Sequence, residues 1–278
     1  MKCDRIYLKD YFPELGENGC NAYVDYFIPE AIQAEGLKEK AYPCMVVCPG
    51  GGYRFVSDRE SEVIGTQFLS ESYRVFVITY SVKPHSFPQQ LREVAGVMEL
   101  IHRYAKEWQI DTEKIAIIGF SAGGHLAAQY SNRYDCPEVR EIFPESKPVQ
   151  ASILSYAVLT ANEKYRHAGS IRNFVGHEDP VEVTEKGCSC ELLVSEKTPQ
   201  TFLWHTAEDK SVPVENSLFY ARALSEHKIP FELHIYPYGE HGASLANEQV
   251  YAKEVDARLA HAQGWVTDVK SWLKVIGF

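Results

Sequence analysis

Short apolar runs without polar alternation are the feature that most constrains the fold of this chain. Side chains along a strand alternate between its two faces, so such a run indicates a strand buried on both faces, as in a parallel sheet. The runs lie at residues 44–48, 74–80, 114–118, 150–154, 201–204 and 231–236. Helical patterns separate them, most clearly at residues 89–108, where apolar side chains recur at steps of three and four. This alternation predicts an α/β fold with a mostly parallel sheet and helices on both faces.

Further elements extend this prediction. Residues 21–28 are rich in strand formers and are expected to form an edge strand or a hairpin ahead of the parallel series. Shorter helices are expected at residues 58–71, 122–132, 214–227 and 266–275. Of the 278 residues, 45% are hydrophobic and 24% are charged, which is an ordinary globular composition. We expect one domain over residues 1–278.

Residues 157–198 interrupt the pattern of strands and helices. They follow the strand at residues 150–154, taken as the sixth of the fold, and show neither a helical nor a strand period. Charged residues are spread through them from Glu163 to Lys186. A loop of this length in a compact domain is usually functional or disordered. We expect a polar, cap-like insertion over one end of the sheet.

The net charge and the cysteines limit the partners of the chain. A formal net charge of −10 opposes binding to the phosphate backbone of nucleic acid. No apolar run approaches the roughly 18 residues of a spanning helix, and the first residues lack the apolar stretch of a secretory signal. The seven cysteines follow no framework spacing, and Cys188-Ser189-Cys190 lacks a second ligand pair. We therefore expect a cytoplasmic chain with no membrane, metal or cofactor, and leave a homodimer open.

A serine between glycines, in the stretch Gly-Phe-Ser-Ala-Gly at residues 119–123, carries the first chemical signal. A predicted strand ends just before this stretch, and a helix-forming run follows it. A glycine turn with an incidental serine would need neither neighbour. The strand–turn–helix context therefore predicts a nucleophile elbow, a sharp turn that exposes the hydroxyl of Ser121.

A serine becomes a good nucleophile only when a base takes its proton and a third group orients that base. Asp209 follows the strand at residues 201–204, and His241 follows the strand at residues 231–236. The order serine, acid, histidine is the one found with a nucleophile elbow. Glu208 adjoins Asp209, but the spacing Asp-x-x-Val-Pro favours Asp209. We predict that Ser121, Asp209 and His241 form a catalytic triad.

The glycine run at residues 50–52 follows the first strand of the parallel series. Without Cβ atoms, its backbone N–H groups can approach a reacting carbonyl closely. We predict that amides of this run form an oxyanion hole, with the amide of Ala122, immediately after the nucleophile, as a second donor. A phosphate cradle is the alternative, but no Gly-Lys-Ser/Thr follows the run.

Three neighbouring side chains receive other interpretations. We expect His125 to pack under the elbow turn and His205 to be a buried hydrogen-bonding residue. Tyr53, after the glycine run, has two equal interpretations: it lines an acyl pocket, or it walls the loop.

Four stretches give the chain a family resemblance. They are "CPGGGY" (48–53), "IDTEKIAIIGFSAGGHLAA" (110–128), "TPQTFLWHTAEDKSVPVENS" (198–217) and "GEHG" (239–242). From about residue 40 to its C-terminus, the chain resembles α/β-hydrolases of the carboxylesterase group. It is most similar to bacterial acetyl-xylan or feruloyl esterase-like proteins, also described as sugar hydrolases. Pro49 stands where lipase-like relatives have histidine, so which glycine amide points inward stays open.

The resemblance implies a cofactor-free serine esterase that forms an acyl-enzyme on Ser121, with His241 as the base and Asp209 as the orienting acid. It also implies that the oxyanion donors are the amides of Gly51, Gly52 and Ala122. It also implies short-acyl esters as substrates, such as acetylated sugars or other small polar esters. A serine peptidase of the prolyl-oligopeptidase type shares the elbow and the triad order. A binding module that has the fold without catalysis is the other alternative.

Overall fold

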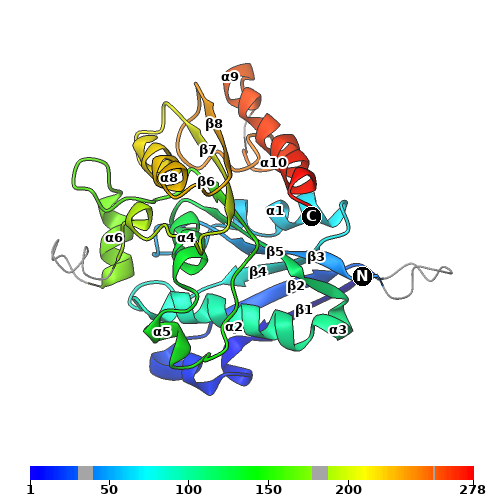
Figure 1. Cartoon of the computed structure of the whole chain (residues 1–278). Coiled ribbons are helices and arrows are strands. Elements are labelled where there is room, and N and C mark those ends of the chain that lie inside the picture. Colours follow the sequence, from blue (N-terminus) through cyan, green and yellow to red (C-terminus); the bar gives the residue numbers. More distant parts are fainter. Residues whose placement is uncertain (31–39, 177–186, 253) are drawn as a thin grey trace.

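One eight-stranded sheet runs through the computed structural model, which describes residues 1–30, 40–176, 187–252 and 254–278 (Figure 1). The strand order is β1-β2-β4-β3-β5-β6-β7-β8. β1 and β2 are antiparallel to their neighbours, and all other pairs are parallel. The strands are β1 (Lys2–Tyr7), β2 (Tyr23–Ile28), β3 (Tyr42–Cys48), β4 (Arg74–Thr79), β5 (Ile110–Phe120), β6 (Ala151–Ser155), β7 (Gln200–Thr206) and β8 (Phe231–Tyr236).

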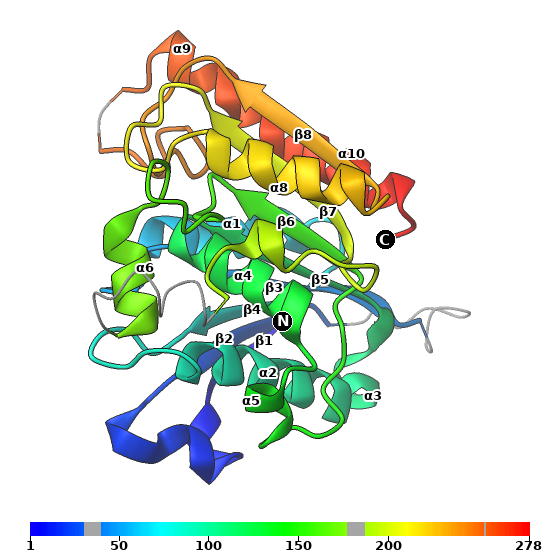
Figure 2. The ribbon, with the colours of Figure 1, turned by 60° about the vertical axis from the view of Figure 1, so that its left-hand side comes forward.

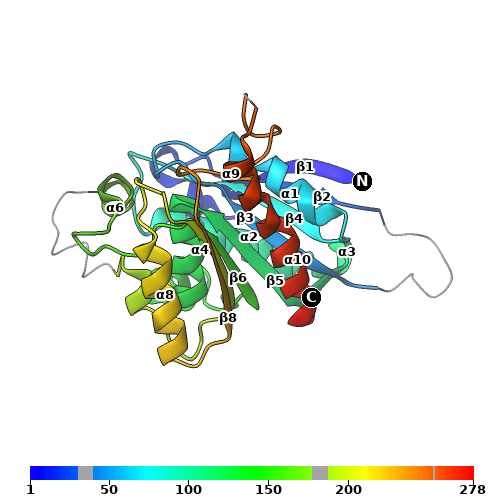
Figure 3. The same cartoon turned by 90° about the horizontal axis from the view of Figure 1, so that it is seen from above.

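Helices cover both faces of the sheet. The α-helices are α1 (Glu62–Leu69), α2 (Gln89–Arg103), α3 (Ala105–Trp108), α4 (Ala122–Arg133), α5 (Pro137–Arg140), α6 (Ala168–Val175), α8 (Glu215–Glu226), α9 (Ala257–Ala260) and α10 (Gly264–Val275). The 3₁₀ helices are η1 (Leu8–Asp10), η2 (Pro13–Gly19), η3 (Asp58–Glu60), η4 (Cys190–Leu192) and η5 (His261–Gln263). Seen from above, α4 and α8 lie on one side of β6 and β8 and α10 on the other (Figure 3). The predicted α/β fold is confirmed.

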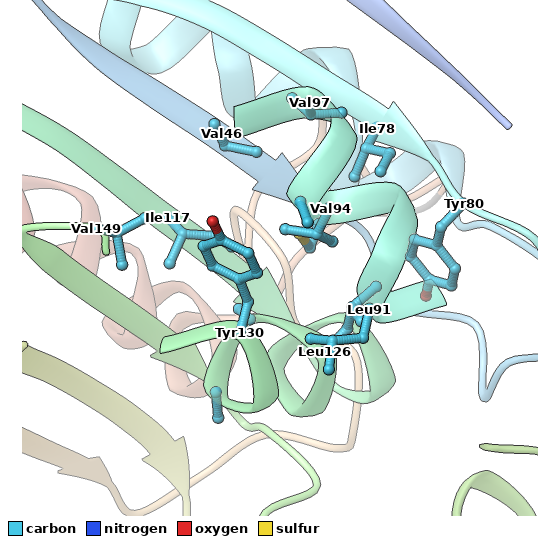
Figure 4. Packing of buried hydrophobic residues seen from close by; sticks show 14 of the residues in the cluster. Val46, Ile78, Tyr80, Leu91, Val94, Val97, Ile117, Leu126, Tyr130 and Val149 are labelled. Atoms are coloured by element: carbon cyan, nitrogen blue, oxygen red, sulfur yellow. The ribbon is translucent and has the colours of Figure 1, made fainter. Parts of the chain in front are cut away.

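The sheet separates two hydrophobic cores. Along β3, Val46 faces the core shared with α2, α4 and α8, while Val47 faces the core shared with α1 and α10. Figure 4 shows Val46 and Ile117 of the sheet near Val94 of α2 and Leu126 of α4. Burying an aliphatic side chain of this size contributes about 1.5–3 kcal/mol. Because both faces of the central strands are buried, their sequences lack polar alternation.

The edge of the sheet formed by β1 differs from the sequence prediction. The sheet extends from β1 and β2 at one edge to β8 at the other (Figure 2). Within the segment 21–28, residues 23–28 form β2, which pairs antiparallel with β1. β1 lies outside it, so the edge-strand alternative is wrong. β1 had no prediction because most of its residues are polar and exposed, and only pairing with β2 makes it a strand. The helix expected at residues 89–108 breaks at Tyr104 into α2 and α3.

The segment 157–198 is less polar in its contacts than its composition indicates. Val158, Leu159, Cys188 and Cys190 are buried in the core beside α4 and α8. Among the described residues between them, α6 forms an amphipathic helix. Residues 177–186, including the charged His177-Glu178-Asp179, lie outside the described residues. In the part of the chain that is described, no helix is long and apolar enough to cross a bilayer.

Candidate active site

Ser121 is held at a sharp turn between β5 and α4. Its backbone has φ 53° and ψ −118°, a combination that a non-glycine residue rarely adopts. The flanking glycines make this turn possible by allowing close backbone contact. A Cβ on Gly123 would lie 2.1 Å from the carbonyl oxygen of Cys48, and one on Gly119 would lie 2.2 Å from that of Gly123. The turn therefore has the strained geometry expected of a nucleophile elbow.

A chain of hydrogen bonds links three side chains from separate loops. Ser121 Oγ lies 2.7 Å from His241 Nε2, and His241 Nδ1 lies 2.6 Å from Asp209 Oδ2. The ionised carboxylate can only accept, so Nδ1 carries the proton and Nε2 is left to accept from the serine hydroxyl. The structure thus brings together the three residues that the sequence motifs selected.

The carboxyl of Asp209 is buried and fully hydrogen-bonded. Its Oδ1 accepts from the amides of Ser211 at 2.9 Å and Val212 at 2.8 Å, and His205 Nε2 lies 3.4 Å from Oδ2. Burial alone raises the pKa of this carboxyl. The imidazoles of His205 and His241 and the Val212 amide outweigh that effect and hold the pKa well below its usual range. Asp209 is therefore ionised at neutral pH.

Glu208, the neighbouring acid, points elsewhere. It forms an exposed ion pair with Arg258 at 3.0 Å and accepts weakly from the amide of Gly239. The spacing argument that favoured Asp209 over Glu208 agrees with this geometry.

The glycine loop offers free backbone donors beside Ser121. The amide of Gly50 is not one of them, because it donates to Glu60 Oε2 at 2.9 Å. Among the described residues, the amides of Gly51, Gly52 and Ala122 have no acceptor. Gly51 has φ 126°, and a Cβ there would lie 1.9 Å from the carbonyl oxygen of Phe55, so only glycine fits. Free N–H groups at this position can hold a developing negative charge on a substrate oxygen.

Ser121 and His241 open into a cleft of about 460 Å³. Part of its wall comes from Asn173 of α6 and from His167, the N-cap residue of that helix. Asn173 Nδ2 donates to the carbonyl oxygen of Gly52 at 2.8 Å. Burial and the nearby charge of His241 lower the pKa of His167. The other walls come from Gly51, Gly52, Arg54, Phe55, Ser57, Arg59, Glu60, Gly169, Ser211 and Gly242.

The remaining candidate side chains are structural. Tyr53 is fully buried and its hydroxyl lies 2.8 Å from His125 Nδ1, so it walls the glycine loop and does not line the cleft. Burial lowers the pKa of His125 to about 4, which keeps this imidazole neutral beneath the elbow. His205 is buried between Ser217 and Val212. His205 lies near the end of β7, four residues before Asp209, and this closeness in the chain lets its imidazole approach the Asp209 carboxylate.

No motif pointed to the cleft residues Glu60, His167 and Asn173. They lie on short helical segments that carry ordinary surface-like sequences. Only the folding of η3 and α6 against the glycine loop brings them to Ser121.

A mostly parallel sheet with a serine at a strand–helix elbow, followed in the chain by an acid and a histidine, defines an α/β-hydrolase of the esterase type. The solved acetyl ester-xyloside bifunctional hydrolase from Caldicellulosiruptor lactoaceticus superposes with a TM-score of 0.84 at 33% identity, over 99% of this chain and 97% of that one. Residues 31–224 match the BD-FAE family model. The chain belongs to the BD-FAE family.

Two curated relatives are longer than this chain. Endo-1,4-beta-xylanase B of Butyrivibrio fibrisolvens is 34% identical over 85% of this chain, but the match covers 38% of the relative. Acetylxylan esterase of Xylanibacter ruminicola is 28% identical over 96% of this chain and 51% of the relative. The chain therefore spans about two fifths to one half of the length of these relatives.

Proposed function

We propose that this chain is a serine carboxylester hydrolase that removes short acyl groups from sugars or similar small polar alcohols. The observation that carries the proposal is the continuous chain of hydrogen bonds from Ser121 through His241 to Asp209, which opens into a cleft lined by free amides. Each component has a role in ester cleavage that the others cannot fill.

In the first half of the reaction, Ser121 Oγ attacks the ester carbonyl while His241 Nε2 takes its proton. Asp209 keeps the proton on Nδ1 and stabilises the imidazolium that forms. The carbonyl oxygen becomes an oxyanion, which the amides of Gly51, Gly52 and Ala122 are positioned to bind. The imidazolium then protonates the leaving alcohol, and an acyl-enzyme remains.

In the second half, water enters the cleft and His241 Nε2 removes one of its protons. The resulting hydroxide attacks the acyl carbonyl, the same amides hold the second oxyanion, and Ser121 Oγ leaves with the proton from His241. The products are a carboxylic acid and the free enzyme. No cofactor takes part in this sequence.

The proposed substrate class rests on the walls of the cleft and on the relatives. Arg54, His167 and Asn173 present hydrogen-bonding groups, and Phe55, which is 53% exposed, presents an aromatic ring. Such a surface suits sugar hydroxyls better than a long acyl chain, which requires a continuous apolar wall. The names of the X. ruminicola and C. lactoaceticus proteins, acetylxylan esterase and acetyl ester-xyloside hydrolase, point to the same class.

Replacing the nucleophile tests the reaction. We expect Ser121→Ala and His241→Ala each to lower kcat for p-nitrophenyl acetate by roughly 10⁶-fold, and the double variant to lose little more, because the triad acts as a unit. A fluorophosphonate probe should label the wild type at Ser121 and leave Ser121→Ala unlabelled. Losses that multiply in the double variant would contradict a shared role.

Graded substrates test the specificity. We expect kcat/KM to fall from p-nitrophenyl acetate through butyrate to octanoate, with acetylated xylo-oligosaccharides cleaved and peptide amides left intact. A preference for octanoate would contradict the substrate class, and cleavage of the amides would favour a peptidase.

A further inference from the structure

Glu60 is a buried carboxylate beneath the glycine loop, and no step of the proposed reaction uses it. We propose that Glu60 is a positioning residue that acts through Tyr156. It holds the glycine loop (residues 50–52), which carries the oxyanion donors, in register with the His241 loop (residues 239–244). The inference rests on the proposed esterase function, and its test separates the two.

Glu60 is only 4% exposed, and both of its carboxylate oxygens accept hydrogen bonds from the protein. Oε2 accepts from the amide of Gly50 at 2.9 Å, and Oε1 accepts from the hydroxyl of Tyr156 at 2.5 Å. A Cβ on Gly50 would lie 2.6 Å from Oε2, so the close approach depends on glycine. This bond fixes Gly50 one residue before Gly51, the first proposed oxyanion donor.

Tyr156 carries the connection to the other side of the cleft. Its hydroxyl accepts from the amide of Ser244 at 3.0 Å, and its ring packs edge-on against the ring of His241 with centroids 5.3 Å apart. The backbone of Tyr156 has φ 36°, in the left-handed region. A buried non-glycine residue keeps such a conformation only where its surroundings demand it. Glu60 and Ser244 are two of those surroundings.

The turn that holds Glu60 contacts the His241 loop a second time. Arg59 donates from its guanidinium to the carbonyl oxygen of Gly242 at 2.9 Å, and the hydroxyl of Ser244 donates to the Arg59 carbonyl oxygen. The residues on each side of Ala243 are therefore tied to η3. A shift of Glu60 would move the glycine loop and the His241 loop relative to each other.

The network requires a group that accepts at both ends. The Gly50 amide can only donate, and the Tyr156 hydroxyl, which accepts from the Ser244 amide, donates its one proton to Glu60. A glutamine at position 60 has the same size but offers a single acceptor oxygen. If that oxygen keeps the Gly50 amide, the NH₂ group faces Tyr156, and the hydroxyl proton of Tyr156 loses its acceptor. Glu60→Gln therefore disturbs the position of the loops with little change in volume.

The oxyanion and the imidazolium exist only after the attack on the ester, so loss of register should affect the transition state more than substrate binding. We expect Glu60→Gln to lower kcat for p-nitrophenyl acetate by about 10- to 100-fold, while KM changes by less than about threefold. Tyr156→Phe should act in the same direction. The double variant should be no slower than the slower single variant, because both changes break one network.

Glu62→Gln is the matched control, since Glu62 undergoes the same chemical change at an exposed position two residues away. It should leave kcat, KM and the melting temperature unchanged. Measuring Tm for every variant identifies loss of the folded state. If Glu60→Gln does not fold, Tyr156→Phe, which removes a single hydroxyl, decides the question.

Fluorophosphonate labelling separates the two proposals. A wild type that is not labelled at Ser121 overturns the esterase function and this inference with it. A labelled wild type upholds the nucleophile, and labelling of Glu60→Gln at a rate at least tenfold lower supports the positioning role. If folded Glu60→Gln or folded Tyr156→Phe is labelled and turns over within twofold of the wild type, the positioning role is wrong and the esterase function stands.

Discussion

Asp209 and Glu93 are both buried carboxyl groups with several hydrogen bonds, but their pKa values move in opposite directions. Glu93, on α2, is fully buried and accepts from the amide and hydroxyl of Ser81 and from the amide group of Gln89. Burial raises its pKa to about 7, because these neutral donors offset only part of the cost of desolvation. Burial also raises the pKa of Asp209, but there the two imidazoles win.

The difference shows that the number of hydrogen bonds does not decide the charge of a buried acid. Asp209 has hydrogen bonds from the imidazoles of His205 and His241 and an electrostatic attraction to His241, whereas Glu93 has only amide and hydroxyl donors. Asp209 is thus kept as an anion that orients and stabilises an imidazolium. Glu93 braces the loop after β4, where the Lys83 amide reaches the Tyr53 carbonyl oxygen at 2.8 Å, and this structural role does not require a permanent charge.

The largest expected effect comes from removing the charge at Asp209. Asp209→Asn should lower kcat by about 10⁴-fold, because an amide can hold the His241 imidazole in the wrong tautomer. The measurement is steady-state hydrolysis of p-nitrophenyl acetate near pH 7. Glu208→Gln is the matched control and should retain full activity, since that side chain is exposed and paired with Arg258. A greater loss in Glu208→Gln would transfer the orienting role to Glu208.

Asp209 and Glu93 also show which buried acids the sequence could predict and which it could not. Asp209 was predictable because it follows an apolar strand and stands in the order serine, acid, histidine. Glu93 and Glu60 look like ordinary helix or turn residues in the sequence. Their burial depends on partners from other parts of the chain, which only the folded structure brings close. The Tyr156 hydroxyl that contacts Glu60 is 96 residues away in the chain.

The strands of the sheet show the same dependence on partners that are distant in the sequence. The central strands were predictable because burial on both faces removes polar residues from their sequences. β1 was not, because Lys2–Tyr7 is held by pairing with β2 and not by burial. In the segment 157–198, short apolar pairs such as Val158-Leu159 reach the core, but the charged residues from Glu163 onward conceal this in an average over the segment.

The second prediction contrasts the two acids through the pH dependence of stability. The pKa of Glu93 is raised from 4.5 to about 7, so its contribution is full below about pH 4.5 and is lost as the pH rises to about 7. The loss amounts to about 3 kcal/mol in the free energy of unfolding. The lowered pKa of Asp209 acts in the opposite sense, and its contribution is lost as the pH falls below about 3.8.

Urea unfolding of the wild type and of Glu93→Gln at several pH values isolates the contribution of Glu93 to the free energy of unfolding. The stability difference between the two proteins should change by about 3 kcal/mol between pH 4.5 and 7 and stay flat above pH 8. Activity per folded molecule should remain near that of the wild type, because Glu93 does not touch the cleft. A constant stability difference across this range would show that Glu93 titrates normally.

The smallest expected effect tests how much a neutral donor matters. Gln89 Nε2 donates to Glu93 Oε1 at 2.8 Å and to the carbonyl oxygen of Leu15 at 3.0 Å, and its bond to Glu93 lowers the pKa of that acid. Gln89→Met keeps the length of the side chain but removes both bonds, at a cost of about 1 kcal/mol in stability. The midpoint of the pH–stability transition of Glu93 should then move upward by less than about one pH unit. The measurement is the same urea series, with Gln89→Met compared to the double variant Gln89→Met/Glu93→Gln. If the midpoint moves upward by several units, neutral donors control this carboxyl as strongly as charged partners do, and the contrast with Asp209 needs another cause. A downward shift would show that Gln89 does not stabilise the ionised carboxyl.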